Sequence, residues 1–412
     1  MTDFQENSEH GAYYPSFFKI VIHTIWPLDN IKGLNQIVKG TLIHEQIHFI
    51  QDISSTYGLM NISATYNLIG YLKELISKNQ TTVLELPLIF TPLINIKSFS
   101  DLKGDSSFIK DGSNIKFDDF SYIIKHCDNH KKAIITCLLD GNNVGSFEFG
   151  SICIKECMAH MIQEIIDPKI IHDVVPYRIA KIIAEKIYPE FAVEPLNIIA
   201  LCSFSLYLPD CGSFYLDFLL KMKQGNYIPK KPTDIFDLGE AIRFDYNGIT
   251  NIRDLHQSMF DSALEQIETY FGKIDLVKEK FNSFKKLFDD NPKILIEIIS
   301  NLDFSIDVKI ENLIEVFGFP QVSNMDESFF DVNRKNSWEW IHFSILKSVL
   351  NVVLEGHKTC SFYNDFCKYS KDKSCIDEFC LNRPWKKIGN ISCPFTISWE
   401  EWGLDKFEIL NR

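Results

Sequence analysis

The segment Thr41-Leu-Ile-His-Glu-Gln-Ile-His-Phe-Ile-Gln-Asp52 contains two histidines four residues apart, His44 and His48. On an α-helix, side chains at positions i and i+4 lie on one face, so both imidazoles can reach one metal ion. Glu45 lies at the edge of that face, where it can polarise a metal-bound water without being a ligand. The spacing therefore predicts two zinc ligands and a general base within about one and a half helical turns.

Apolar residues cover most of this segment, which indicates a buried helix. Its polar stripe consists of Thr41, His44, His48, Gln51 and Ser55. These side chains need partners inside the protein, because an unpaired buried polar group costs several kcal/mol. A metal-lined cleft supplies such partners. The simpler alternative is a buried helix whose histidines only form hydrogen bonds.

The residues before this helix predict a strand. The run 16–26 is rich in β-branched and aromatic residues and ends at Pro27, and Leu28-Asp29-Asn30 then offers capping residues. We expect the helix over about 31–55, with a tolerable interruption at Gly40. The strand could offer an edge to which an extended peptide adds, and its lone His23 is interpreted as structural.

A second apolar helix is predicted over 150–166, and it repeats the pattern of the first. Glu156, His160 and Gln163 recur at positions i, i+4 and i+7 and form its polar stripe. Two buried helices with one polar stripe each are best satisfied by facing one another. Glu156 is therefore the candidate third metal ligand. Alternatively, it is a buried carboxylate paired with His160 or a lysine.

The other elements are predicted from periodicity and from breaks at proline and glycine. We expect a loose arm over 1–16, a helix over 62–78, a loop-rich stretch over 81–120, a hairpin turning at 140–143 between 132–139 and 144–149, helices over 177–188, 194–208, 212–223, 234–246, 252–271, 277–288 and 338–356, and a less regular segment over 357–412.

Composition narrows the classes of partner. The 412 residues carry a net charge of −13 without a dense Lys/Arg cluster, so nucleic acid is not expected. The N-terminus lacks the features of a secretory signal, and the longest apolar run, 195–209, is too short to span a bilayer. The eleven cysteines, many inside apolar segments, predict reduced thiols and a cytoplasmic protein.

The C-terminal segment invites two further interpretations. It holds His357 and the cysteines Cys360, Cys367, Cys375, Cys380 and Cys393. Because no pair has the Cys-x-x-Cys spacing, core and surface thiols are favoured over a structural zinc. The cluster Trp399-Glu-Glu-Trp402 is interpreted as packing or as a solvated face, with docking of a partner as the alternative.

The first helix resembles those of the zincin metallopeptidases, and a downstream glutamate makes the gluzincin group the closest match. The resemblance implies that His44, His48 and Glu156 bind zinc. It also implies that Glu45 is the general base that later protonates the leaving amine. A water in the fourth position would then attack a peptide carbonyl.

Several residues depart from the thermolysin-like pattern. Its Asn-Glu-x-x-Ser-Asp run is replaced by Lys155-Glu-Cys-Met-Ala-His160, and 108 residues separate His48 from Glu156. The aspartate that orients the first zinc histidine is thus missing, and Asp52 and Gln51 are candidates for its role.

Peptide hydrolysis also requires a hydrogen-bond donor that stabilises the oxyanion of the tetrahedral intermediate. His160 is the candidate catalytic electrophile that stabilises the tetrahedral oxyanion, or else a partner of Glu156. Tyr57 and Tyr66 are other possible oxyanion donors.

We therefore expect an α+β, predominantly helical fold: a zincin-like core over 1–190 with a small N-terminal sheet, and a helical body over 191–412. The expected function is a cytoplasmic zinc endopeptidase that cleaves one or a few intracellular proteins. Bacterial peptidases of this kind act in stress responses and phage defence, but that context rests on analogy alone.

Two alternatives remain open. A two-histidine, one-carboxylate set also suits Fe(II), as in peptide hydroxylases that use 2-oxoglutarate, for which Arg178 and Arg243 are candidate contacts. The other is a non-catalytic binding protein with a degenerate site, which the presence of Glu45 disfavours. The oligomeric state is left open.

Overall fold

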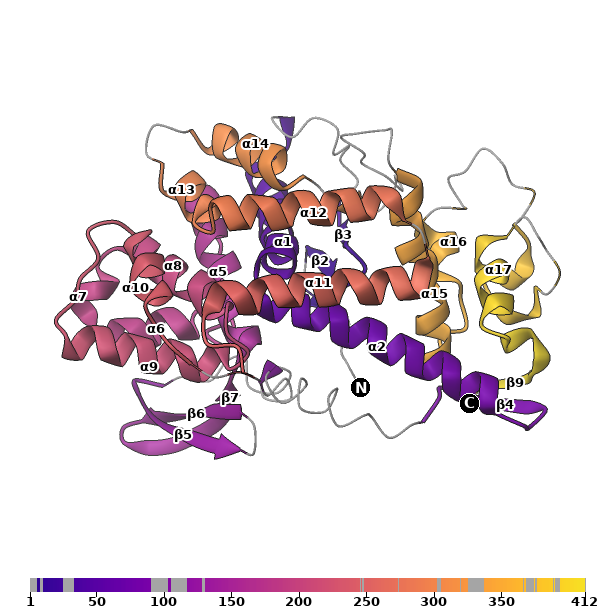
Figure 1. Cartoon of the computed structure of the whole chain (residues 1–412), viewed down its shortest axis with the longest axis horizontal. Coiled ribbons are helices and arrows are strands. Elements are labelled where there is room, and N and C mark those ends of the chain that lie inside the picture. The colour runs from indigo at the N-terminus through magenta and orange to yellow at the C-terminus, as the bar shows by residue number, and fades with distance from the viewer. Residues whose placement is uncertain are drawn as a thin grey trace.

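The structure is a computed structural model. It describes residues 6–7, 10–24, 33–89, 103–104, 117–127, 130–244, 246, 248–272, 274–301, 305–318, 320–324, 337–365, 367, 374, 376–387, 389 and 393–411. The chain is α+β and predominantly helical, with small sheets, as expected (Figure 1).

The helices account for most of the described residues. They are α1 (Gln36–Ser54), α2 (Thr56–Lys78), α5 (Ser151–Ile166), α6 (Ile179–Ile187), α7 (Pro189–Ala192), α8 (Pro195–Ser205), α9 (Cys211–Gln224), α10 (Asp234–Glu240), α11 (Ile252–Phe271), α12 (Asp275–Asp290), α13 (Ile294–Ser300), α14 (Ile306–Phe317), α15 (Ser337–Glu355), α16 (Ser361–Asp365) and α17 (Pro394–Glu401), with the 3-10 turns η3 (Glu378–Cys380), η4 (Pro384–Lys386) and η5 (Leu404–Lys406).

The strands form separate small sheets. They are β1 (Glu6–Asn7), β2 (Gly11–Tyr14), β3 (Lys19–Ile22), β4 (Val83–Leu86), β5 (Asp119–Cys127), β6 (His130–Leu139), β7 (Asn142–Phe149), β8 (Gln321–Ser323) and β9 (Glu408–Asn411). Their orders are β1-β2-β3-β8, β5-β6-β7 and β4-β9.

The N-terminal sheet corrects two expectations. Residues 11–14, predicted to be part of a loose arm, form β2, which pairs antiparallel with β3. The predicted strand over 16–26 is shorter, because the chain turns at Ser16 and Phe18, whose φ angles are 63° and 50°. Residues 25–26 lie outside the described residues. Because β3 also pairs in parallel with β8, it is an interior strand and offers no edge for a peptide.

Helix α1 begins later than predicted. Asn35 is its N-cap and accepts a hydrogen bond from the backbone N–H of Val38 at 2.9 Å. An N-cap side chain satisfies one of the unpaired N–H groups of the first turn, so the cap fixes the helix start at Gln36. The predicted capping residues 28–30 and residues 31–32 lie outside the described residues.

Ser55 joins the first two helices. It ends α1, and its hydroxyl accepts a hydrogen bond from the backbone N–H of Gly58 at 3.0 Å, which caps α2. Helix α2 therefore starts at Thr56, earlier than the predicted residue 62. Helix α11 lies along α2, and α12 runs beside α11 (Figure 1).

The hairpin before α5 is confirmed. Strands β6 and β7 pair antiparallel, and Asp140 and Gly141 both have positive φ, as a two-residue hairpin turn requires. The stretch predicted to be loop-rich includes β4 and the start of β5, which pairs with β6. Of that stretch, residues 90–102 and 105–116 lie outside the described residues. Helix α5 matches its predicted range closely.

The second half of the chain is helical, as predicted, with differences at the ends of helices. Helix α10 stops at Glu240 instead of Tyr246. Helix α13 lies in the part predicted to be helical up to about residue 301, although without a range of its own, and α14 was not predicted. In the segment predicted to be less regular, β9 pairs in parallel with β4, and Trp399 and Trp402 are buried. Residues of both predicted parts belong to one hydrophobic core, and the boundary near residue 190 stays a prediction.

None of the described helices combines the length and the continuous hydrophobicity that crossing a bilayer requires.

Candidate metal centre

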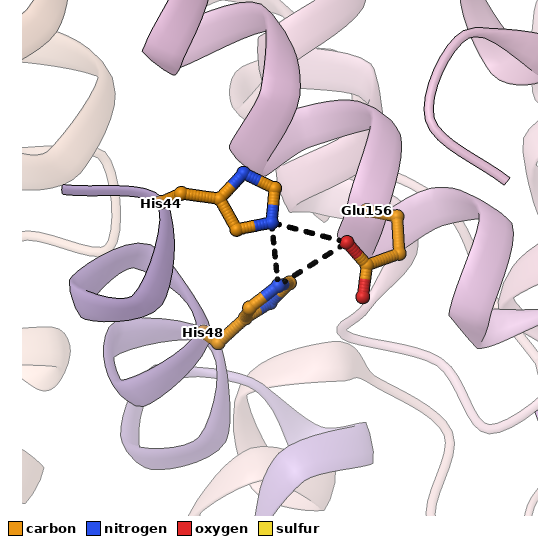
Figure 2. A group of neighbouring side chains, drawn as sticks. All are labelled: His44, His48 and Glu156. Atoms are coloured by element: carbon orange, nitrogen blue, oxygen red, sulfur yellow. Dashed lines mark hydrogen bonds and ion pairs between the residues drawn. The ribbon is translucent and has the colours of Figure 1, made fainter. Parts of the chain in front are cut away.

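The structure brings the three predicted ligands together. His44 and His48 project from α1 toward Glu156 on α5, and their side-chain donors converge on one point (Figure 2). The Nε2 of His44 lies 3.1 Å from the Oε2 of Glu156 and 3.1 Å from the Nε2 of His48. The Nε2 of His48 lies 3.4 Å from the same oxygen.

These separations fit a metal ion. Ligand atoms bound at about 2.0–2.1 Å in a tetrahedron lie about 3.3 Å from one another. The three observed separations, 3.1, 3.1 and 3.4 Å, are close to the edges of such a tetrahedral face. Among the described residues, this is the group of His, Cys, Asp and Glu side chains whose geometry suits a metal ion. The identity of the ion stays a prediction.

Hydrogen bonds at the other ring nitrogens fix the tautomer of both histidines. The Nδ1 of His44 lies 3.0 Å from the Oε1 of Gln163, and the Nδ1 of His48 lies 2.9 Å from the Oε1 of Gln51. An amide oxygen only accepts, so each Nδ1 must carry the proton that it donates. In the neutral rings, both Nε2 atoms are then left with a lone pair, which is what metal ligation requires.

Charge at the site favours an ionised Glu156. Burial alone would raise the pKa of this carboxyl group, but His48 and His44, when their rings are protonated, hold it well below its usual value. His44, His48 and Glu156 are only 3%, 1% and 5% exposed. A buried carboxylate beside two imidazole lone pairs is a strong attractor for a divalent cation.

Further polar contacts hold α1 against α5 on both sides of the ligands. At one end, the Nε2 of Gln36 donates to the carbonyl oxygen of Ile166 at 2.6 Å. At the other end, the Nε2 of Gln51 donates to the carbonyl oxygen of Lys155 at 3.1 Å, which orients the Gln51 amide toward His48. The Nζ of Lys155 also lies 3.5 Å from the Oδ1 of Asp52. The distance between the helices is thus set by contacts other than the ligands.

The two candidates for orienting the first histidine have other partners. Gln51 orients His48, and Asp52 accepts a hydrogen bond from the hydroxyl of Tyr13 at 3.0 Å besides pairing with Lys155. The residue that holds His44 is Gln163, which sequence reasoning placed on the polar stripe without that role. Its position, seven residues after Glu156, was the available signal, because i and i+7 share a helix face.

Glu45 is buried in α1 beneath the N-terminal sheet, and it is 1% exposed. Gly11 on β2 lets the strand approach: a Cβ at Gly11 would lie 2.8 Å from Cγ2 of Thr41 and 3.3 Å from Cγ of Glu45. Such contacts are too close for an ordinary side chain. The strand therefore packs directly on the helix face that follows the first ligand. The role of Glu45 as a general base stays a prediction.

His160 does not pair with Glu156 among the contacts of the described residues. Its Nε2 lies 3.3 Å from the Oε1 of Glu164, one turn along α5. Its ring lies edge-on to that of His172, with centroids 5.0 Å apart. The alternative in which His160 supports Glu156 is thus not observed, and its role as an electrophile stays a prediction.

Sequence reasoning missed two aromatic rings beside the ligands. His172 and Tyr177, from the loop between α5 and α6, stack with centroids 4.5 Å apart, and they lie 6.1 and 6.0 Å from the His44 ring. The Nε2 of His172 lies 3.3 Å from the Oε1 of Gln163. Burial, followed by His160 and His44, lowers the pKa of His172 to about 4. No periodicity marks such loop residues in the sequence.

The remaining candidates lie in other surroundings. The hydroxyl of Tyr66 donates to the carbonyl oxygen of Ser16 at 3.2 Å, and Tyr57 is buried at the start of α2. Arg243 donates to the carbonyl oxygen of Glu240 at 3.2 Å, just after α10. Arg178 precedes α6, next to Tyr177 in the sequence.

Comparison of this chain with protein-family models, with curated proteins and with solved structures found no match. The function is therefore inferred from the site itself.

Proposed function

We propose that this chain is a zinc-dependent endopeptidase with a zincin-like core over residues 1–190. In this proposal His44, His48 and Glu156 hold the metal ion, and Glu45 is the general base. The observation that carries it is the meeting of three donor atoms from two helices, with both Nε2 atoms left unprotonated by hydrogen bonds at Nδ1. Glu45 directly follows the first ligand, as hydrolysis by this arrangement requires.

Each group then has one chemical task. When bound, zinc would supply a water of lowered pKa and a positive charge beside the substrate carbonyl. Glu45 accepts a proton from that water and returns it to the nitrogen of the leaving amine. Gln163 and Gln51 keep the rings of His44 and His48 in the tautomer that presents Nε2.

Tyr177 is the donor that we favour for the oxyanion of the tetrahedral intermediate. A phenol hydroxyl near the metal can donate a hydrogen bond to the developing negative charge. The ring of Tyr177 lies 6.0 Å from that of His44. In the contact with Gln163, His172 uses its Nε2–H as the donor, so His172 is less suited to that task.

The substrate class is a protein or peptide, and the targets are few. Support comes from the burial of the ligands, of which the most exposed, Glu156, is 5% accessible. A substrate segment that reaches such a buried site must fit a narrow approach, which disfavours cleavage of a wide range of proteins. The proposal includes a cytoplasmic location, which the many buried thiols support.

The test compares new protein N-termini in cells that express the wild-type chain or Glu45→Gln. We expect cleavage products that are present with the wild-type chain and reduced at least about 100-fold with Glu45→Gln, because a general base typically contributes that much. The matched control is Glu74→Gln, the same chemical change on an exposed pair of α2, which should cleave normally. Equal N-termini from all three chains would overturn the proposal.

Metal analysis of the same proteins separates the alternatives. Zinc at about one ion per chain, retained by Glu45→Gln, is expected because Glu45 is not a ligand. Iron together with product formation that depends on 2-oxoglutarate would instead identify a hydroxylase.

A further inference from the structure

A second group of reactive side chains lies apart from the metal centre, in the C-terminal cap, which we define as the described residues over 357–411. Three buried cysteines lie there: Cys360 directly before α16, Cys380 at the end of η3, and Cys393 at the N-cap of α17. The backbone N–H of Cys360 donates to the carbonyl oxygen of Cys380 at 2.9 Å. Burial raises the pKa of the Cys360 thiol, and its cysteine neighbours raise it further. The cap thus collects thiols in a small volume.

A buried lysine reaches into this group. The side chain of Lys387 is 3% exposed, and its Nζ lies 3.0 Å from the Sγ of Cys380 and 3.2 Å from the Oδ2 of Asp377. Lysine is almost never this buried unless its ammonium group is paired. Burial alone would lower the pKa of Lys387, but its hydrogen bonds with Cys380 and Asp377 raise it. The Lys387 nitrogen and the Cys380 sulfur are thus held at hydrogen-bonding distance from each other.

The pair lies close to the protein surface. The side chain of Asp377, which contacts both Lys387 and Cys380, is 39% exposed. Leu381, which follows Cys380 in the sequence, is 54% exposed. Oxidation of a cysteine at such a site would place an oxygen atom on the sulfur, beside the Nζ of Lys387.

We propose that Lys387 and Cys380 form an oxidative crosslink in which one oxygen atom bridges Nζ and Sγ. The separation of 3.0 Å between these atoms is one that a single bridging atom spans with a small shift of either side chain. The crosslink is a modification site, independent of the proposed peptidase activity. The oxidant is dioxygen.

The reaction is balanced with one dioxygen molecule per crosslink. An amine, a thiol and dioxygen give the N–O–S bridge and one water. The N–O and O–S bonds form, while one N–H bond, the S–H bond and the O–O bond break. Nitrogen and sulfur together lose four electrons, which reduce the dioxygen. The second oxygen atom leaves as water with the two released protons.

The crosslink would join the end of η3 to the residue that follows η4 within the C-terminal cap. Cys380 ends η3, Lys387 follows η4, and the hydroxyl of Thr396 on α17 donates to the carbonyl oxygen of Lys387 at 2.9 Å. Helix α17 packs against α15, and β9 near the chain end pairs with β4. We therefore expect the oxidised chain to unfold at a higher temperature than the reduced chain, by a few degrees.

The experiment uses the full-length protein, purified with dithiothreitol and then divided. One half stays reduced, and the other is kept in air-saturated buffer without thiol. We expect the intact mass to rise by about 14 Da in the second half and to return after dithiothreitol is added. Tryptic peptides that contain Cys380 and Lys387 should stay joined until they are reduced.

Variants identify the atoms involved. Lys387→Arg keeps a cation but removes the amine, so the gain of about 14 Da should vanish, as it should in Cys380→Ser. The matched control is Cys393→Ser, which removes a neighbouring thiol and should still gain the mass.

Several results would overturn the crosslink. These are a loss of about 2 Da from a disulfide between Cys380 and Cys360, an unchanged mass after air exposure, or a gain that persists in Lys387→Arg. Should Lys387→Arg fail to fold by circular dichroism, peptide mapping of the wild-type chain alone decides the question.

Discussion

At the scale of single residues, the metal centre depends on which ring nitrogen carries a proton. Two glutamine oxygens accept from Nδ1 of His44 and His48, and this leaves Nε2 of both rings as lone-pair donors. A glutamine is an unusual choice, because a carboxylate in that position would make the ligand more basic. Glu156 compensates in part for this lower basicity of the histidine ligands, since it supplies a full negative charge next to both rings.

Loss of the carboxylate ligand should empty the site. We expect Glu156→Ala to bind metal more than about 100-fold more weakly than wild type, because even an outer hydrogen-bond partner is worth 10–100-fold. The measurement is metal content by mass spectrometry after dialysis, with Glu164→Ala on the same helix as the control. Full retention of zinc by Glu156→Ala would remove this residue from the ligand set.

Gln163 should affect metal binding without touching the metal. In Gln163→Leu the Nδ1 of His44 loses its acceptor, so the ring can change tautomer, and we expect metal affinity to fall about 10–100-fold. Competition with a fluorescent zinc chelator measures the affinity. Gln257→Leu, the same change at a half-buried position on α11, is the control, and equal affinities in the two variants would contradict the role of Gln163.

At the scale of elements, two helices distant in sequence carry the site, and polar contacts hold them together. Periodicity predicted both helices and one polar face on each, so the convergence of His44, His48 and Glu156 could be inferred from the sequence. The orienting role of Gln163 could not, because the pattern does not say which stripe residue meets which partner. His172 and Tyr177 were missed because loop positions follow from tertiary packing. Strand β8 was missed because three residues carry too little periodicity.

Helix α11 provides an acid-sensitive contact with the end of α1. The Nε2 of His256 donates to the carbonyl oxygen of Ser54 at 2.9 Å, and burial lowers the pKa of His256 from 6.5 to about 4. Between these values the unfolded chain binds a proton that the folded chain does not. The contribution of His256 to the free energy of unfolding is thus fully present above pH 6.5. It falls by up to about 3 kcal/mol as the pH decreases toward 4.

Replacement of that histidine should flatten the pH dependence. Between pH 7 and pH 5 we expect His256→Gln to lose about 2 kcal/mol less unfolding free energy than wild type, whatever its stability at pH 7. Urea unfolding at both pH values measures this difference. His172 titrates in the same range in both chains and cancels in the comparison. His357→Gln on the exposed cap surface is the control, and equal slopes for wild type and His256→Gln would contradict the assignment.

At the scale of the whole molecule, the metal centre lies within one continuous hydrophobic core. The core includes residues of α1, α2, α5, α11 and α15, so the two helices that carry the site share one core with elements from both halves of the chain (Figure 1). The hydrophobic composition of the chain predicted a large hydrophobic core. It could not predict that β8 pairs with β3 or that β9 pairs with β4, because such pairing is decided by long-range packing.

Removal of the metal should therefore destabilise the whole chain. A ligand that binds only the folded state stabilises it by about 4 kcal/mol at a concentration 1,000 times its Kd. For a chain of this size, that corresponds to a Tm lower by about 5 °C after dialysis against a chelator, with recovery when zinc is added. Because α1 and α5 share the core with the other helices, the unfolding transition should shift as one unit. Glu156→Ala provides the control, since its Tm should not respond to the chelator. A wild-type Tm that is equally insensitive would mean that no metal bridges the two helices.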